Sequence, residues 1–568
     1  MFRSIRLGKT FGDVAQEAFD TETDSRGDLL VLCNSKRATS RYPEFKEVIR
    51  FLWKESKQLN WFFNLRFDAD AMFKLAFQTK VKHGIKDKVI TLVYGKYLIE
   101  CFDYKLLKIT YRGLVKNFWD LARFLDGSLD SLAQKYLGEK KTGLEFDKNR
   151  METYDFGAVV SYCIRDSYLT RKLAEFLNEK IELVSEQLTG KKKSPAQYYS
   201  KASLSEFYVC EVVDNSLLQP YRGLGKITIP LLRDAYRSFH GGMFQVFNKG
   251  LLTNTSTYDI NSAYPYEIKN LLPLDGVWVR KEKEYDLSAD FGIYHVNQRF
   301  LGFSPVRLHG TIIYPVTKKK YENYITKPEL SYLIELGENV EVLDAWEHFR
   351  SSEFRPFESF INLLYEAKTE SKKKHDLALY WLYKVIMNSL YGKFVQSRGD
   401  RAGRIFNPVW GSVITANTRL KVWKAAQTLE RCDYIATDSI TGIGKPYIEL
   451  GEDLGQWSSK ENEDMILIQN GLSLSLKEDK WIFKNSRGFS KSETEHFTLE
   501  KDKLRVRTLK PYHLIEALKS HRLEEVNRFL PVSKEYELNA EGIRVWLDKF
   551  SKDKLVRSLP FDDIVLEE

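Results

Sequence analysis

Four acidic residues near the start of the chain have the types and spacing of a metal-binding set. Asp20 and Glu22 stand two apart in the β-favouring run FDTET, so the alternation of a strand would place both carboxylates on one face. Asp68 follows in FNLRFDAD and Asp166 in SYCIRDSYLT, where Tyr162 lies one helical turn earlier. Mg²⁺ prefers oxygen ligands, and two-metal phosphodiester hydrolysis needs several carboxylates around ions about 4 Å apart. Tyr162 would then orient the attacking water.

A second candidate set lies further along the chain. In TYDINSAYPYEIKN a β-favouring run ends at Asp259, and a helix is expected to begin near Pro265. A carboxylate at such a turn could hold a metal ion, while the free N–H groups of the helix start face a phosphate. Tyr264 would lie beneath a bound sugar. In CDYIATDSITGIG two strands are predicted around a tight turn with Asp438, a candidate partner carboxylate for Asp259.

The segment YKVIMNSLYGKF places Lys384, Asn388 and Tyr391 at positions i, i+4 and i+7, on one face of one helix. On one helix face, a lysine could bind a triphosphate and an aromatic ring could contact a base. Taken singly, each of these features has an ordinary explanation, such as a solvated acid, a turn with a capping acid or a polar helix stripe. Their joint occurrence in one order favours the functional interpretation.

The early acidic segments have the order and form of the three exonuclease motifs of the DnaQ-like superfamily: DxE, then NxxFD (64–68), then YxxxD (162–166). The N-terminal region therefore resembles a 3′–5′ proofreading exonuclease, which implies a ribonuclease-H-like sheet. The resemblance implies metal-binding, catalytic roles for Asp20, Glu22, Asp68 and Asp166, a catalytic role for Tyr162, and DNA contacts by Asn64 and Phe67. It also leaves open whether Lys140 or Lys141 corresponds to an auxiliary lysine of that family.

The later segments DxxSxYP, KxxxNSxYGK and YxxTDS are similar to motifs A, B and C of family B DNA polymerases, in the right order. The closest resemblance is to the protein-primed branch of phages, viruses and linear plasmids. FHGG (239–242) is similar to a YxGG element between the two activities, and VITANTR is similar to a primer-contacting segment. The resemblance implies catalytic metal ligation by Asp259 and Asp438 with the carbonyl of Ile260, nucleotide binding by Ile260, Tyr264, Lys384, Asn388 and Tyr391, and DNA binding by Phe239, Gly241, Gly242, Lys393, Thr415 and Arg419.

The elements that must position these residues predict an α/β and α+β multidomain chain. A polar stretch at 188–203 marks the best internal boundary. We expect an exonuclease domain at 1–190 followed by a right-hand polymerase. Its parts would be a first palm segment at 191–272, a terminal-protein-region insertion at 273–355, fingers at 356–397, a second palm segment at 398–500, and a thumb and C-terminal region at 501–568. The helical pattern of the fingers predicts two helices.

The pattern departs from the family at two places. Motif C normally reads YxDTDS, and this chain has Ala436 in place of the first acid. Only about 22 residues separate Lys393 from Thr415, which is short for the second insertion that encircles DNA in the best-known relatives. The leading hypothesis is template-directed DNA synthesis with 3′–5′ proofreading, primed by a terminal protein and using two Mg²⁺ (or Mn²⁺) ions per active site. The alternatives are a polymerase-derived DNA-binding protein and a nuclease whose polymerase half only holds DNA.

Composition agrees with a nucleic-acid enzyme without identifying one. The 568 residues carry a net charge of +9, from 87 Lys and Arg against 78 Asp and Glu, which favours an anionic partner. Five cysteines without a CxxC pair fit a reducing intracellular setting. No apolar run approaches the about 18 residues of a membrane span, and we find no targeting segment. We therefore expect primer-template DNA, dNTPs and a terminal protein as partners, no membrane, a monomer, and the host cytoplasm.

Overall fold

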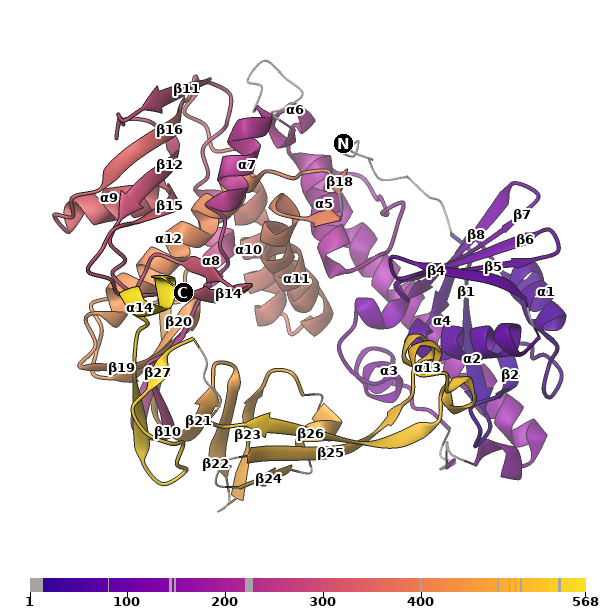
Figure 1. The fold of residues 1–568 in the computed structure, drawn as a ribbon. Helices are drawn as coiled ribbons and strands as arrows, with labels where there is room; N and C mark the ends of the chain where they lie inside the picture. The colour runs from indigo at the N-terminus through magenta and orange to yellow at the C-terminus, as the bar shows by residue number, and fades with distance from the viewer. Residues whose placement is uncertain are drawn as a thin grey trace.

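A computed structural model describes residues 14–79, 81–142, 146–147, 150–219, 228–398, 401–477, 480–489, 491–495, 497–500, 503–539 and 543–567. Figure 1 shows an N-terminal lobe and a larger second lobe, with helices between them and a long C-terminal hairpin on the opposite side. No helix in the described ranges combines the length and apolar character needed to cross a membrane.

The N-terminal lobe is built on a mixed sheet of eight strands in the order β2-β1-β3-β8-β7-β6-β5-β4. β1 runs antiparallel to β2 and parallel to β3, and β3 runs parallel to β8. The strands are β1 (Gln16–Thr23), β2 (Leu29–Asn34), β3 (Leu59–Phe62), β4 (Lys82–Lys86), β5 (Val89–Tyr94), β6 (Tyr97–Phe102), β7 (Leu106–Tyr111) and β8 (Leu114–Asp120). The predicted α/β character of this region is confirmed.

Helices cover this sheet through apolar residues at helical spacing. In α1 (Phe45–Glu55) the buried positions are Phe45, Val48, Ile49 and Leu52, the i, i+3, i+4, i+7 pattern of a helix with one face in a core. The other helices of the lobe are α2 (Leu65–Gln78), α3 (Leu129–Leu137) and the 34-residue α4 (Phe156–Thr189), which packs across β1 and β2.

A nine-stranded antiparallel sheet forms the centre of the second lobe, with a main path β23-β22-β21-β10-β20-β19-β9 and β28 joining β10 and β27. The long strand β10 pairs with β20, β21 and β28, so it lies in the middle of the sheet. The strands are β9 (Met243–Val246), β10 (Asn248–Ile260), β19 (Arg431–Thr437), β20 (Ser439–Ile443), β21 (Trp457–Gln469), β22 (Leu472–Lys477), β23 (Lys480–Ser486), β27 (Val545–Trp546) and β28 (Leu555–Leu559).

Helices pack against this sheet and join the two lobes. They are α5 (Lys201–Val212), α6 (Asn215–Leu218), α7 (Ile229–Arg237), α8 (Ala263–Lys269), α10 (Glu358–Lys373), α11 (Leu377–Phe394) and α12 (Pro408–Ala426). The two helices predicted in the finger region are confirmed as α10 and α11. They separate at residues 374–376, where the side chain of Asp376 accepts from the N–H of Leu379 and caps α11.

Two further sheets complete the second lobe. The span predicted as an insertion folds into a four-stranded sheet in the order β11-β16-β12-β15. The helix α9 (Lys327–Glu335) lies between β15 and β16 in the sequence. Its strands are β11 (Val277–Glu282), β12 (Phe291–Gln298), β15 (Tyr321–Thr326) and β16 (Glu341–Phe349), beside the hairpin of β13 (Val306–Leu308) and β14 (Thr311–Ile313). The C-terminal sheet comprises β24 (Phe497–Leu499), β25 (Lys503–Pro511) and β26 (Phe529–Glu537), followed later by α14 (Asp563–Glu567).

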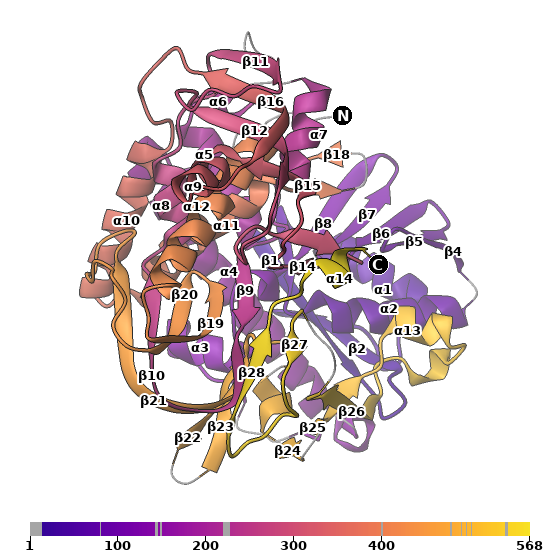
Figure 2. The same cartoon turned by 60° about the vertical axis from the view of Figure 1, so that its left-hand side comes forward.

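The hairpin of β25 and β26 reaches from the second lobe to the N-terminal lobe. At its tip α13 (Leu514–Lys519) packs against α2. Figure 1 shows this hairpin along the lower edge from one lobe to the other, and Figures 1 and 2 both show α13 beside α2.

Candidate active sites

The structure brings three of the four early acids together. Asp20 and Glu22 lie on β1, and α4 crosses this strand and presents Asp166. One carboxylate oxygen from each of the three lies within 4.8 Å of the others. Glu22 and Asp166 are buried, at 6% and 4% exposure, so a cation held here would be largely shielded from water. This is the donor set of a hard divalent cation.

Asp68 lies beside this group, on the first turn of α2. The hydroxyl of Thr21 donates to its carboxylate at 2.8 Å, which ties α2 to β1. Burial raises the pKa of Asp68 well above its usual range, and the negative charge of Asp20 raises it further. A cation near these acids would favour the ionised form that burial disfavours.

Lys141, rather than Lys140, faces the acids. Its ammonium contacts the carboxylate of Asp166 and donates to the hydroxyl of Tyr162 at 3.3 Å. Burial works to lower the pKa of Lys141, but the charge and hydrogen bond of Asp166, with the charges of Tyr162 and Asp20, together raise it. Burial and the charge of Asp166 raise the pKa of Tyr162 to about 12, so this hydroxyl keeps its proton at neutral pH. Lys140 uses its backbone carbonyl to accept from Arg165.

The second pair of acids meets at the ends of adjacent strands. Asp259 lies near the end of β10, opposite Ser439 of β20, and Asp438 occupies the turn between β19 and β20. The N–H of Ile260 donates to the carbonyl of Asp438 at 2.9 Å, which fixes this turn against β10. Thr437 takes a left-handed conformation, with φ of 61°.

These two carboxylates influence each other. Burial raises the pKa of Asp438 to about 6, and the neighbouring charge of Asp259 contributes to that shift. Loss of hydration also raises the pKa of Asp259, although its side chain reaches the surface, while the positive charges of Lys460 and Lys384 lower it. Two acids that resist ionisation side by side fit a divalent cation, whose charge would stabilise both carboxylates.

Ala436 supports the turn through its backbone. Its carbonyl accepts from the N–H of Asp438 at 2.8 Å and from the hydroxyl of Ser439 at 3.2 Å. Its half-buried side chain packs against the apolar cluster of Val246, Leu252, Tyr434, Met465 and Leu467. The position is therefore occupied by a side chain that suits its apolar neighbours.

Three of the motifs recognised in the sequence contact one another around Tyr264. The rings of Tyr264 and Tyr391 lie 4.5 Å apart between centroids. A Cβ atom on Gly242 would lie 2.7 Å from the methyl of Thr437 and 2.8 Å from the hydroxyl of Tyr264, so only glycine fits there. The ring of Phe239 lies 6.4 Å from that of Tyr391. Gly241 precedes Gly242 in the same segment.

The exposed face of α11 carries Lys384 and Asn388, as the spacing predicts. A further lysine near this face, Lys368 on α10, escaped the sequence analysis. Burial lowers the pKa of Lys368 to about 8, and the charges of Lys384 and Lys372 lower it further. Because these like charges are a secondary cause beside burial, an anion bound here would favour the charged form of Lys368. The i, i+4 spacing of Lys368 and Lys372 was the available signal, but lysines near a helix end are usually solvated.

Two residues proposed to bind DNA have buried side chains in this structure. Thr415 and Arg419 of α12 are 0% and 1% exposed. Arg419 donates to the carbonyls of His240 and Gly241 at 2.8 and 2.9 Å and pairs with Glu329 at 2.8 Å. In this structure Arg419 holds the FHGG segment in place.

Three further residues proposed to contact DNA differ in how far their side chains are exposed. Lys393 is 7% exposed and pairs with Glu206 at 3.0 Å. Asn64 is exposed before α2 with φ of 66°, and Phe67 is half-buried. Of these three, only Asn64 presents a freely exposed side chain, and DNA binding by all three stays a prediction.

The two lobes, each with a carboxylate site, have the fold of right-hand polymerases with an exonuclease domain, as solved structures show. The chain aligns with Phi29 DNA polymerase complexed with primer-template DNA with a TM-score of 0.65 at 16% identity, covering 92% of this chain and 100% of that one. The complex of the same polymerase with primer-template DNA and incoming nucleotides gives a TM-score of 0.64 at 15% identity, with 93% and 100% covered. The predicted fold class is therefore confirmed.

Sequence comparisons add the family resemblance. Residues 227–449 match the family described as DNA polymerase type B, organellar and viral. A DNA polymerase of Acidianus bottle-shaped virus is 24% identical over 428 residues, which are 68% of this chain and 61% of the relative. A "Probable DNA polymerase" of Podospora anserina is 24% identical over 311 residues, 50% of this chain and 25% of the relative. The predicted resemblance to family B DNA polymerases is confirmed, although the chain spans at most 61% of the length of these two relatives.

Proposed function

We propose that the protein is a DNA-directed DNA polymerase with 3′–5′ exonuclease activity. The observation that carries the proposal is the presence of two separate carboxylate sites, Asp259 with Asp438 in the second lobe and the Asp20, Glu22 and Asp166 group in the first. The relatives and the structural matches are named as DNA polymerases or a probable DNA polymerase, which supports DNA synthesis as the activity.

In the polymerase site, Asp259 and Asp438 would hold the Mg²⁺ or Mn²⁺ ions, with the carbonyl of Ile260 as a further oxygen. Bound there, two ions would lower the pKa of the primer 3′-hydroxyl and neutralise charge on the triphosphate. Lys384 on the exposed face of α11 would bind the triphosphate, with Lys368 adding to the positive charge. Asn388 and Tyr391 would position the nucleotide.

In the exonuclease site, Asp20, Glu22 and Asp166 would hold the ions and Asp68 would complete the set. The protonated hydroxyl of Tyr162 is suited to orient a water molecule by a hydrogen bond, because its pKa lies at about 12. Lys141 would keep Tyr162 and Asp166 in position and supply positive charge beside the leaving strand.

Priming by a terminal protein is the finer part of the proposal. The four-stranded sheet of β11, β16, β12 and β15 with α9 occupies the span between Asp259 and α10, where the family resemblance implies a terminal-protein region. The match to the organellar and viral type supports this branch. We keep the monomeric state, the domain limits given above and the host cytoplasm as predictions.

Primer extension in an exonuclease-silenced protein tests the proposal directly. The variant Asp20→Ala/Glu22→Ala, with Mg²⁺ and all four dNTPs, should lengthen a 5′-labelled primer on a template. No extension at any dNTP concentration would leave a DNA-binding protein or a nuclease as the function. Intact Asp259, Asp438 and Lys384 weigh against the non-catalytic DNA-binding protein.

Sugar selection gives a prediction at Tyr264. If its ring lies beneath the sugar, replacing Tyr264 by valine should admit ribonucleotides and lower the dNTP/rNTP ratio of kcat/KM about tenfold to a hundredfold, the range that a contact of a few atoms provides. Because the ring packs on Tyr391 and touches Gly242, incorporation of dNTPs should be measured as the control. An unchanged ratio would show that the ring does not contact the sugar.

The apolar surroundings of Ala436 lead to a prediction about the missing acid. We expect the protein to extend primers with alanine at this position, and Ala436→Asp to bring no gain in rate, because a carboxylate would replace a side chain packed on apolar neighbours. An uncompensated polar group of this kind costs about 1–3 kcal/mol and should lower the Tm. Ala436→Ser serves as the matched control of similar size. A clear increase in extension rate for the aspartate variant would show that the site lacks a useful acid.

A further inference from the structure

The hairpin of β25 and β26 is anchored in two different hydrophobic cores. It pairs without interruption from Lys503 opposite Glu537 to Pro511 opposite Phe529. At one end Leu504 and Val506 are buried in a cluster with residues of β21 and β22. At the other end Leu514, Ala517 and Val526 are 0% exposed within the core of the N-terminal lobe. A nine-residue strand spans about 30 Å, so the hairpin is a bridge between the lobes.

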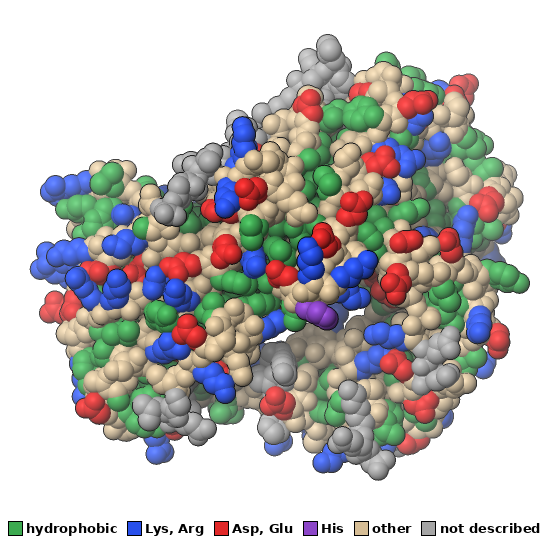
Figure 3. Space-filling model, turned by 180° about the vertical axis from the view of Figure 1, so that it is seen from behind, with side chains coloured by type: hydrophobic (Ala, Val, Ile, Leu, Met, Phe, Trp, Pro, Cys, Tyr) green, Lys and Arg blue, Asp and Glu red, His purple; other side chains and the backbone are tan. Residues whose placement is uncertain are grey.

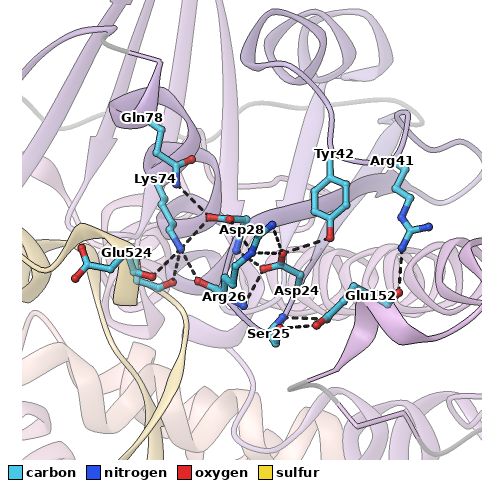
Figure 4. Close-up of polar contacts among 11 residues, drawn as sticks. Asp24, Ser25, Arg26, Asp28, Arg41, Tyr42, Lys74, Gln78, Glu152 and Glu524 are labelled. Carbon is cyan, nitrogen blue, oxygen red and sulfur yellow. Dashed lines mark hydrogen bonds and ion pairs between the residues drawn. The ribbon is translucent and has the colours of Figure 1, made fainter.

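Buried polar contacts hold the tip of this bridge on the N-terminal lobe. The side chain of Lys74 on α2 is 1% exposed, and its ammonium donates to the carbonyl of Glu524 at 3.1 Å and to that of Val526 at 3.4 Å. It also donates to the carbonyl of Arg26 at 2.6 Å and pairs with Asp28 at 3.0 Å. Figure 4 shows these contacts converging on Lys74 from the β1–β2 turn and from the tip. One buried cation therefore joins two segments far apart in sequence.

A second set of contacts comes from the same face of α2. The carboxylate of Asp70 is fully buried and accepts from the ring nitrogen of His513 at 3.1 Å and from the N–H of Leu514 at 3.3 Å. The amide of Asn527 donates to the carbonyl of Phe67 at 2.8 Å. Residues 67, 70 and 74 share one face of α2, so the tip binds this face through several specific hydrogen bonds.

The middle of the bridge is exposed and positively charged. Leu509 is 58% exposed, which shows that this part of the hairpin has no core of its own. Arg507 on β25 and Arg528, where the tip meets β26, are exposed, and no ion pair to either is found within the described ranges. Exposed guanidinium groups without a protein partner are suited to phosphate oxygens.

The bridge closes the chain into a ring. The lobes are joined on one side by α4, α5 and α11, which pack against one another, and on the other side by the hairpin. The space-filling view shows the surface hollowed between the lobes, with Lys and Arg side chains around the hollow (Figure 3). In the described part of the finger-to-α12 connection, the strands β17 (Ser397–Arg398) and β18 (Arg401–Ala402) are two residues long, so these strands contribute little to the ring.

We propose that residues 503–537, here called the clasp, close the protein around primer-template DNA. The proposal rests on the DNA polymerase function proposed above. Phosphate contacts by exposed arginines are weakened by salt and would alone allow rapid dissociation. A closed clasp adds a topological barrier, since the DNA leaves only past a strand end or after the tip separates from α2. The C-terminal hairpin would thereby encircle DNA in place of the second insertion, for which the connection between Lys393 and Thr415 is too short.

Gly27 offers a way to open the clasp without touching either active site. It has φ of 74° in the β1–β2 turn, and a Cβ atom there would lie 2.0 Å from the carbonyl oxygen of Val526 in the tip. Gly27→Ala should push the tip off the lobe. Gly113→Ala is the matched control, because Gly113 has φ of 82° in the same lobe with nothing within 4 Å of the added atom. Asn527→Gly loosens the tip from the hairpin side and tolerates the φ of 63° at that position.

The test measures dissociation of labelled protein from a primed circular single strand and from the same DNA linearised, in EDTA with excess heparin. For the wild type and Gly113→Ala we expect a half-life about tenfold longer on the circle, and for Gly27→Ala and Asn527→Gly no difference between the two DNAs. Equal half-lives for the wild type, or a retained difference in both tip variants with unchanged Tm, would overturn the clasp. This assay needs no catalysis, so it separates the clasp from the polymerase function. Primer extension with equal half-lives on the two DNAs would contradict the clasp alone. A longer half-life on the circle without primer extension would contradict the polymerase function alone.

Discussion

Asp438→Asn should abolish primer extension while leaving 3′–5′ degradation of single-stranded DNA unchanged. The substitution keeps the size of the side chain but removes the charge that, with Asp259, would hold the metal ions. A metal ion acting as a Lewis acid supplies several kcal/mol, and each 1.36 kcal/mol is a factor of ten, so we expect a loss of about a thousandfold or more. The turn itself should persist, because it is held by backbone hydrogen bonds of Ala436, Asp438 and Ile260.

Both activities are measured on the same preparation, with extension followed by single-nucleotide incorporation and degradation by shortening of a labelled strand. Ser458→Ala, which removes a hydroxyl that donates to the carbonyl of Asp259 at 3.3 Å, serves as a neighbouring control of small expected effect. Extension at near wild-type rate in Asp438→Asn would show that motif C has been wrongly assigned.

The second large effect is expected from the N-terminal lobe. Asp20→Ala with Glu22→Ala removes two of the three carboxylates that lie within 4.8 Å of one another, so degradation should fall about a thousandfold or more. Extension should be spared, because the second carboxylate pair lies on a different sheet. Lys141→Met should have a smaller effect on the same activity, since it removes the contact with Tyr162 and Asp166 but no metal ligand.

Retained degradation in the double variant would mean that the acids of β1 do not form the exonuclease site. A parallel loss of extension would point instead to misfolding of the lobe, which far-UV circular dichroism and the Tm would reveal.

The acids could be predicted from the sequence because short motifs encode them locally. Asp20 and Glu22 share a strand face, and Asp259 ends a β-favouring run, so the local pattern already fixes their orientation. The strand and helix types followed from periodicity in the same way, as the break between α10 and α11 shows. These features depend on neighbours in sequence.

What the sequence could not provide depends on packing between distant segments. The sequence does not distinguish the adjacent lysines Lys140 and Lys141, and only the fold shows that Lys141 contacts Asp166. The buried ion pair of Arg419 with Glu329, ninety residues earlier, likewise appears only in the fold. The seat of the clasp pairs Lys74 with a turn about 450 positions later, which no local pattern encodes.

The central claim, that one chain carries both activities, is tested most directly by a single dNTP titration. A 5′-labelled primer on a longer template is incubated with the wild-type protein and Mg²⁺ over a range of dNTP concentrations. The account predicts that the primer is shortened without dNTPs and extended to the template end at high concentration, with a crossover between them. Shortening at every concentration, without any product longer than the primer, would contradict it.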